Sequence, residues 1–316
     1  MAGMSVSEAP DLAFSVALTP PDLSHCLAGN TGIAGFHTIV GAAPGPHVGI
    51  VALIHGNEFA GAAVLAQLLR DGVRPARGRL TLGFANLAAF ARFDPAQPAA
   101  SRFVDEDMNR VWDPDLLASN RRSVELDRAR EILPLISEMD VLLDLHSMLW
   151  PSDPLILCGT TARGRDLALH LGAAPLVVAD SGHASGRRLI DHPRFADPMA
   201  TATAILLEAG QHWQPESVDT AARAVAALLC SQRLSDAPPP SGAARFARVT
   251  QVVTAMTPQF SFVRHFRGGE VIAAADTLLA RDGDTEIRTP HKDCLLVMPS
   301  WRASRGHTAV RLARFG

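Results

Sequence analysis

The stretch VGIVALIHGNEFAGAAVLAQLL, residues 48–69, decides the fold. Its first part, residues 48–54, is a continuous apolar run, which is typical of a strand buried on both faces of a parallel sheet. Residues 59–69 have the length and the apolar content that predict a helix. His55 and Glu58 therefore fall on the turn between a strand and a helix, at the edge where open α/β sheets form their ligand sites.

Two later apolar runs also end in a polar side chain. Residues 141–145 lead into His146, and residues 204–207 lead into Glu208. Both runs predict strands that carry a chemically active group at the carboxyl end. Asp144 precedes His146 by two residues and lies on the same face of its strand, from which it either approaches the site or hydrogen-bonds a ligand imidazole.

His55, Glu58 and His146 together predict a metal site. A histidine and a glutamate three residues apart have a spacing that metal ligands use. A helix-capping histidine with a first-turn glutamate gives the same pattern, but the second histidine at another strand end favours the metal. Catalytic zinc has three nitrogen or oxygen ligands and one open position, so we expect one Zn²⁺ per chain.

A dense polar segment, RFVDEDMNR at residues 102–110, follows a long loop. Loops of that length inside a compact domain are usually functional or mobile. The guanidinium groups of Arg102 and Arg110 can hold a carboxylate through paired hydrogen bonds. This segment is therefore the best candidate for binding an anionic substrate.

The order of the expected elements indicates an α/β fold followed by a smaller β region. At 316 residues the chain is long enough for a large catalytic domain, expected at residues 1–235, and a smaller one, expected at residues 241–316. One helix is expected at residues 123–138, with Pro134 kinking or breaking it. The proline-rich segment 236–242 predicts a linker. Short β-like runs follow it, at residues 247–255, 261–265, 270–274, 286–289, 294–298 and 307–312.

The composition excludes several classes of protein. A net charge of -3 gives no positive field for nucleic acid or an anionic membrane. No apolar run reaches the roughly 18 residues of a membrane span, and the N-terminus lacks a basic region followed by a long apolar segment, so we expect a soluble cytoplasmic protein. The four cysteines form no C-x-x-C pair, so neither a thiolate zinc site nor a disulfide framework is indicated. Lys292 is the only lysine among 29 lysine and arginine residues, so a single arginine is a weak indicator of function.

These features make the chain similar to the succinylglutamate desuccinylase/aspartoacylase family, which is related to the zinc carboxypeptidases. The matching motifs, in the family's order, are H-G-N-E at 55–58, R-F-V-D-E-D-M-N-R at 102–110, D-L-H at 144–146 and E-A-G at 208–210. The β-rich tail is similar to the family's C-terminal domain. The resemblance implies a zinc-carboxypeptidase-like mixed sheet flanked by helices, with a smaller C-terminal all-β domain.

Residue by residue, the resemblance implies hydrolysis of an N-acyl amino acid to a carboxylate and a free amino acid. The three metal ligands named above hold zinc, and Glu208 acts as general base and acid. Arg102 polarises the scissile carbonyl, and Asn109 with Arg110 binds the α-carboxylate of the substrate. The residue types agree, because zinc activates water, a carboxylate moves a proton and a guanidinium stabilises an oxyanion.

The chain departs from the family pattern in its substrate pocket. It has no tyrosine, whereas aspartoacylases place a tyrosine from the C-terminal domain on the substrate carboxylate. Candidate replacements are Trp301, Arg302 and His307. A second specificity arginine is expected among Arg187, Arg188 and Arg194, although a surface position is an equal alternative for each.

Two other functions fit the same residues. A carboxypeptidase-like metallopeptidase acting on short peptides would use the same metal and base with a different pocket. A non-enzymatic protein would use the metal structurally, but Glu208 argues against this reading because a closed structural site has no use for an extra carboxylate. The expected partner is a small-molecule N-acyl amino acid, with no nucleic acid or membrane, and a homo-oligomer is compatible with the sequence.

Overall fold

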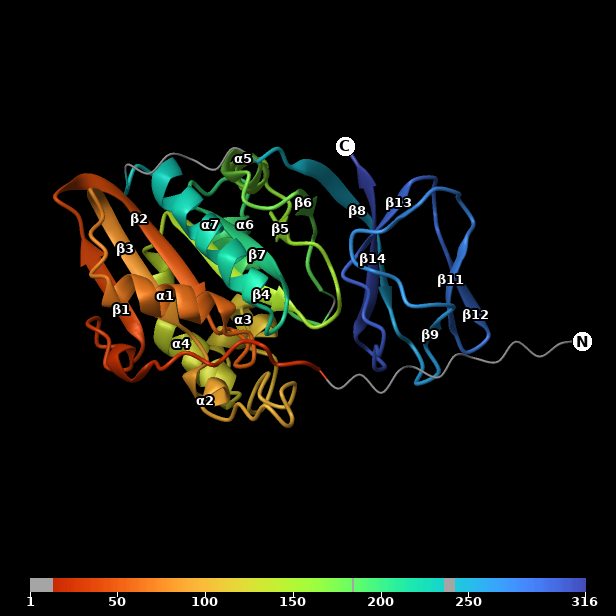
Figure 1. Cartoon of the computed structure of the whole chain (residues 1–316), viewed down its shortest axis with the longest axis horizontal. Coiled ribbons are helices and arrows are strands. Elements are labelled where there is room, and N and C mark those ends of the chain that lie inside the picture. The colour runs from red at the N-terminus through yellow and green to blue at the C-terminus, as the bar shows by residue number, and fades with distance from the viewer. Residues whose placement is uncertain (1–13, 184, 236–241) are drawn as a thin grey trace, which may run out of the picture.

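The computed structural model describes residues 14–183, 185–235 and 242–316, and its centre is a mixed sheet of 11 strands (Figure 1). In spatial order the strands are β1 (Phe36–Val40), β3 (Arg77–Phe84), β2 (Ala43–Ala52), β4 (Val141–Met148), β7 (Thr203–Gln211), β5 (Leu155–Leu157), β6 (Leu176–Ala179), β8 (Arg245–Thr254), β14 (Thr308–Phe315), β13 (Cys294–Val297) and β10 (Val271–Ile272). Strands β3, β2, β4 and β7 pair in parallel. The three apolar runs of the sequence are therefore adjacent buried strands.

Helices cover both faces of the sheet. They are α1 (Ala60–Arg70), α2 (Leu87–Phe90), α3 (Pro114–Ala118), α4 (Val124–Ser137), α5 (Ala162–Leu171), α6 (Pro193–Ala196) and α7 (Pro215–Ser231). Helices α1, α5 and α7 pack on the face to which Leu143 points, and α4 packs on the face to which Leu142 points (Figure 1). Because side chains alternate along a strand, Asp144 and His146 lie on the α4 face, and so does Glu208, the register partner of His146. Among the described residues, no helix has the length and apolarity to cross a membrane.

The chain after the predicted linker is built from strands, as expected. Strand β8 pairs in parallel with β6, so this part extends the main sheet. A second sheet contains β12 (Thr285–Arg288), β11 (Leu278–Asp282) and β9 (Ser261–Phe262). The α/β fold with a C-terminal β region is confirmed. Residues 236–241 of the linker lie outside the described residues, and the domain boundaries stay a prediction.

Of the kink or break expected at Pro134, the structure rules out the break in α4. The helix continues through this proline to Ser137. Proline removes one backbone hydrogen bond from a helix, but here the chain has only three helical residues left to add, and the N–H of Glu138 closes the end by donating to the carbonyls of Ile136 and Leu135. The side chain of Ser123 caps the other end by accepting from the N–H of Leu126.

Candidate active site

The turn between β2 and α1 is packed tightly against the end of helix α2. A Cβ on Gly56 would lie 2.4 Å from the backbone nitrogen of Phe90, so only glycine fits this position. The N–H of Gly56 donates to the carbonyl of Arg102 at 3.0 Å, which ties the turn to the polar segment. His55 and Glu58 are thereby held at the carboxyl end of β2, each with 3% of its surface exposed.

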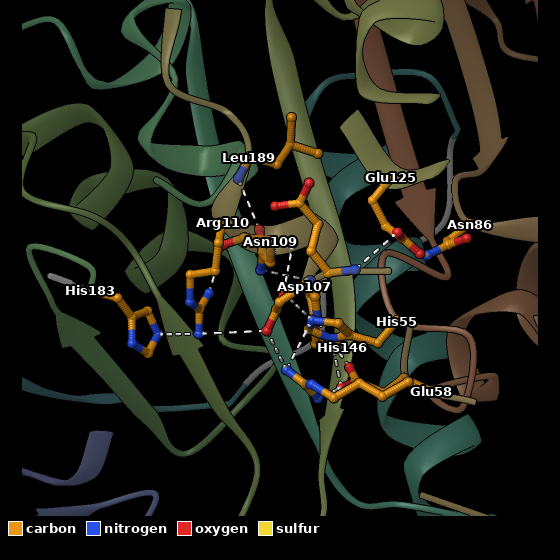
Figure 2. Close-up of polar contacts among 12 residues, drawn as sticks. His55, Glu58, Asn86, Asp107, Asn109, Arg110, Glu125, His146, His183 and Leu189 are labelled. Atoms are coloured by element: carbon orange, nitrogen blue, oxygen red, sulfur yellow. Dashed lines mark hydrogen bonds and ion pairs between the residues drawn. The ribbon is translucent and has the colours of Figure 1, made fainter. Parts of the chain in front are cut away.

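His55, Glu58 and His146 converge on one point (Figure 2). The Nδ1 atom of His55 lies 2.8 Å from Oε1 of Glu58, and Nδ1 of His146 lies 2.9 Å from Oε2 of the same carboxylate. The ligand atoms of the three residues lie within 4.8 Å of one another. Nδ1 of His55 is buried and, despite the short distance to Glu58, makes no hydrogen bond to any of the described residues. Two imidazole nitrogens and a carboxylate in this arrangement fit a divalent cation of the zinc type.

The outer nitrogens of both imidazoles face carboxylates. Oδ1 of Asp107 and Nη2 of Arg102 each lie 2.9 Å from Nε2 of His55, and Oδ2 of Asp144 lies 3.0 Å from Nε2 of His146. A proton on Nε2 leaves the Nδ1 lone pair free for a metal. Burial opposes ionisation of Asp107, but the charges of His55 and Arg102 hold its pKa well below the usual range. Of the two places that the sequence allowed for Asp144, the structure supports the one behind a ligand imidazole.

Glu208 lies beside the cluster on the neighbouring strand β7. Its exposed fraction is 6%, and its Oε2 atom has no hydrogen-bond partner in the described part of the chain. Burial raises the pKa of Glu208 to about 8, with the charge of His146 opposing the shift and that of Glu58 adding to it. A buried carboxyl group that titrates near neutral pH is suited to taking and giving a proton.

Arg102 contacts both the metal cluster and the carboxylate behind it. Its Nη1 donates to Oε1 of Glu58 at 2.9 Å, and its Nη2 donates to Oδ2 of Asp107 at 3.2 Å. The side chain keeps 36% of its surface exposed, so it faces the open side of the cluster. A guanidinium in this place can stabilise negative charge on a substrate oxygen.

Glu125 holds the segment that carries Arg102 in place, and the sequence did not single it out. This fully buried carboxylate accepts hydrogen bonds from the backbone N–H groups of Val104, Asp105 and Glu106 at 2.6, 3.0 and 3.2 Å. It also accepts one from the side chain of Asn86 at 3.0 Å (Figure 2). The polar segment is thus anchored to α4.

Asn109 and Arg110 line the next part of the site. The side-chain nitrogen of Asn109 lies 3.5 Å from Nε2 of His146, and its oxygen accepts from the N–H of Leu189 at 2.9 Å. Arg110 donates from Nη2 to Nε2 of His183 at 2.9 Å (Figure 2). Burial lowers the pKa of Arg110 to about 10.

The three arginines considered for a second specificity contact all have protein partners. Arg188 is buried and is held by two carboxylates, at 2.8 and 2.7 Å. Arg187 pairs with Asp113 at 2.9 Å, and Arg194 donates to the carbonyl of Met139 at 2.9 Å. These bonds give each arginine a role inside the protein.

The candidate replacements for the tyrosine lie in other surroundings. Trp301 stacks on Trp150 and on His265, with ring centroids 5.0 and 4.3 Å apart. Arg302 and His307 are exposed. The structure therefore gives none of these three a buried position beside the metal cluster.

Besides Glu125, the structure adds three residues that the sequence did not single out: His183, His212 and Arg311. Nδ1 of His212 shares a hydrogen bond of 2.7 Å with Oγ of Ser147, and Nε2 of His212 lies 3.9 Å from Oε1 of Glu58. Its position four residues after Glu208, at the same strand end, was a usable signal. Arg311 comes from β14 and donates to Oδ2 of Asp180 at 2.9 Å.

A mixed α/β sheet with a His–Glu–His cluster at its carboxyl edge, and a buried carboxyl group beside it, has the arrangement of a hydrolase. The family model described as the succinylglutamate desuccinylase/aspartoacylase catalytic domain matches residues 44–231. The chain belongs to the succinylglutamate desuccinylase/aspartoacylase family, and it is therefore a hydrolase that acts on amide bonds.

Solved structures share this fold. Succinylglutamate desuccinylase from Vibrio cholerae is 18% identical, with a TM-score of 0.71 over 89% of this chain and 86% of that one. A succinylglutamate desuccinylase/aspartoacylase from Rhodobacter sphaeroides is 18% identical, with a TM-score of 0.65 over 89% and 88%. The product-bound ectoine utilization protein EutE from Ruegeria pomeroyi is 16% identical, with a TM-score of 0.62 over 88% of each chain. At these identities the likeness shows the fold alone. No curated protein matches the chain.

Proposed function

We propose that this protein is a zinc-dependent amidohydrolase that cleaves an N-acyl amino acid to a carboxylate and a free amino acid. The observation that carries the proposal is the convergence of His55, Glu58 and His146 beside the unpartnered carboxyl oxygen of Glu208. Three ligands leave one metal position for water or substrate, as a catalytic site requires. Family membership and structural neighbours that are named succinylglutamate desuccinylase support the substrate class.

His55, Glu58 and His146 would hold the ion, and Asp107 and Asp144 would orient the two imidazoles from behind. When bound, zinc supplies a Lewis acid that polarises a carbonyl and lowers the pKa of water. With a metal bound, a proton between each outer nitrogen and the carboxylate behind it would leave both Nδ1 atoms as ligands.

Glu208 and Arg102 would carry the chemical step. Glu208 takes a proton from the attacking water as the water oxygen bonds to the amide carbon. It then gives the proton to the nitrogen, so that the carbon–nitrogen bond breaks and the amine leaves. Arg102 donates to the carbonyl oxygen as negative charge develops on it.

Asn109 and Arg110 would bind the α-carboxylate of the amino acid. Arg110 is suited to this because its Nη2 faces a neutral ring nitrogen in the structure, and a carboxylate is a stronger acceptor. Holding the carboxylate fixes the distance between the amide carbon and the catalytic groups.

The test is a hydrolysis panel with zinc-loaded protein and with the same protein stripped of metal. Release of free amine is measured for N-acetyl, N-succinyl and N-formyl amino acids beside unmodified dipeptides. We expect turnover of at least one N-acyl amino acid only when metal is present. Turnover confined to dipeptides would replace the proposal with the peptidase reading, and metal-loaded protein that cleaves neither class would refute it.

We also propose a cytoplasmic location, a catalytic domain at residues 1–235 and a C-terminal β domain at residues 241–316. The family model ends at residue 231, close to this boundary. Fractionation of the source cells would test the location, and limited proteolysis would test the boundary by cleaving between residues 235 and 241.

A further inference from the structure

Two arginines from distant parts of the chain donate to the same atom. Nη2 of Arg110 lies 2.9 Å from Nε2 of His183, and Nη2 of Arg311 lies 2.6 Å from that nitrogen. A guanidinium is always a donor, so Nε2 must accept both hydrogen bonds and the proton of the ring must lie on Nδ1, which faces Oγ1 of Thr308 at 3.0 Å. His183 is therefore a neutral acceptor held between two cations.

The carboxylates nearby do not neutralise this pair. Asp180 accepts from Arg311 at 2.9 Å, but it also accepts from Arg188 at 2.8 Å, so its single charge is shared. Asp107 lies 3.9 Å from Arg110 and makes closer bonds elsewhere. The two guanidiniums share one imidazole lone pair where a carboxylate would offer two charged oxygens.

Arg311 also lies close enough to the catalytic side of the site to matter for binding. It is 3% exposed, and it shares the acceptor His183 with Arg110, whose chain neighbour Asn109 reaches His146. Arg188 is less suited to a substrate, because two carboxylates already occupy its guanidinium. Arg311 is thus a buried cation beside Arg110 whose terminal Nη2 meets a neutral acceptor.

We infer that Arg311 is the second arginine that sets specificity, and that the α-carboxylate of the substrate is bound between Arg110 and Arg311, displacing the imidazole of His183 as their shared acceptor. This rests on the proposed function, which supplies the carboxylate. Each guanidinium donates to one carboxylate oxygen, and the negative charge outcompetes the neutral imidazole. The pocket therefore selects a free α-carboxylate over an uncharged amide or ester at that position.

The test uses calorimetry to measure how tightly zinc-loaded protein binds two compounds that resemble the product and are not hydrolysed. They are L-glutamate, which has a free α-carboxylate, and its α-amide. Arg311→Gln should weaken binding of the free acid about 10- to 100-fold, the size expected for a lost charge-assisted hydrogen bond, and leave binding of the α-amide within about twofold. Arg311→Lys keeps a positive charge beside Asp180 and should retain part of the preference. The control is Arg314→Gln, an exposed arginine on the same strand, which should change neither affinity.

Melting temperature and zinc content confirm that each variant is folded, and Arg311→Lys carries the test if Arg311→Gln does not fold. The inference is overturned if wild-type protein does not prefer the acid, if the Arg311 variants keep the wild-type preference, or if acid and amide lose affinity equally. Failure of the proposed function is read separately, from the hydrolysis panel. A protein that cleaves N-acyl amino acids but keeps its preference for the acid without Arg311 refutes only the role of Arg311.

Discussion

Replacing Glu208 with glutamine removes the proposed proton carrier and little else. Glu208 is 6% exposed and its Oε2 atom has no hydrogen-bond partner among the residues that the structure describes, so an amide of the same shape fills the space without breaking a bond at that atom. The loss is therefore that of general base catalysis, about 10²- to 10⁴-fold in turnover, or roughly 3 to 5 kcal/mol of transition-state stabilisation. The metal ligands are untouched, so zinc content should stay at about one ion per chain.

The assay combines steady-state hydrolysis of the best N-acyl amino acid with elemental analysis of the same samples. Glu216→Gln is the matched control, because Glu216 is exposed in the first turn of α7, and it should keep wild-type turnover. A Glu208→Gln protein with near-normal turnover would refute the reasoning. So would loss of zinc, which would make Glu208 a ligand.

Three further outcomes are expected. His55→Ala should lose zinc and activity together in elemental and kinetic analysis, and a variant with stoichiometric zinc would contradict the ligand assignment. Arg110→Ala should mainly raise KM and Arg102→Ala should mainly lower kcat; the reverse pattern in steady-state kinetics would exchange their roles. Burial, with the charge of Arg79 adding to it, lowers the pKa of His47 below 6.5. The unfolded chain therefore binds a proton at His47 more readily than the folded protein does. The stability that this histidine contributes is fully present above about pH 6.5 and is lost as the pH falls below it. Melting temperatures between about pH 8 and pH 5 should fall more steeply for wild type than for His47→Gln, and equal slopes would exclude this contribution.

The buried parallel strands could be predicted because their sequences are predominantly apolar, with Asp144 the one charged residue in the three runs. Residues 48–54, 141–145 and 204–207 all belong to adjacent strands of the observed sheet. Parallel strands share a carboxyl edge, so the polar residues after them meet, and the convergence of His55 with His146 follows from the pattern. Family motifs supplied the expected roles, which spacing alone does not give.

The parts that could not be predicted depend on contacts between distant segments. Arginine is so common in this sequence that Arg311 could not be singled out from it. The burial of Arg311 follows only from the pairing of β14 with β8 and from its bond to Asp180. Strand β1 is short and pairs antiparallel with β3, so its sequence has no long apolar run. Pro134 was expected to interrupt its helix, but so near the helix end the cost is one hydrogen bond.

A protein truncated at the linker would end its sheet at β6. The backbone groups of Leu176–Ala179 that pair with β8 would then face solvent as an open edge, a template for joining other chains. Such a fragment is expected to aggregate, and it would also lack Arg311. Exchanging the C-terminal region between relatives would therefore transfer two features at once: the strand that covers the edge of β6, and Arg311. Solubility and substrate preference would change together.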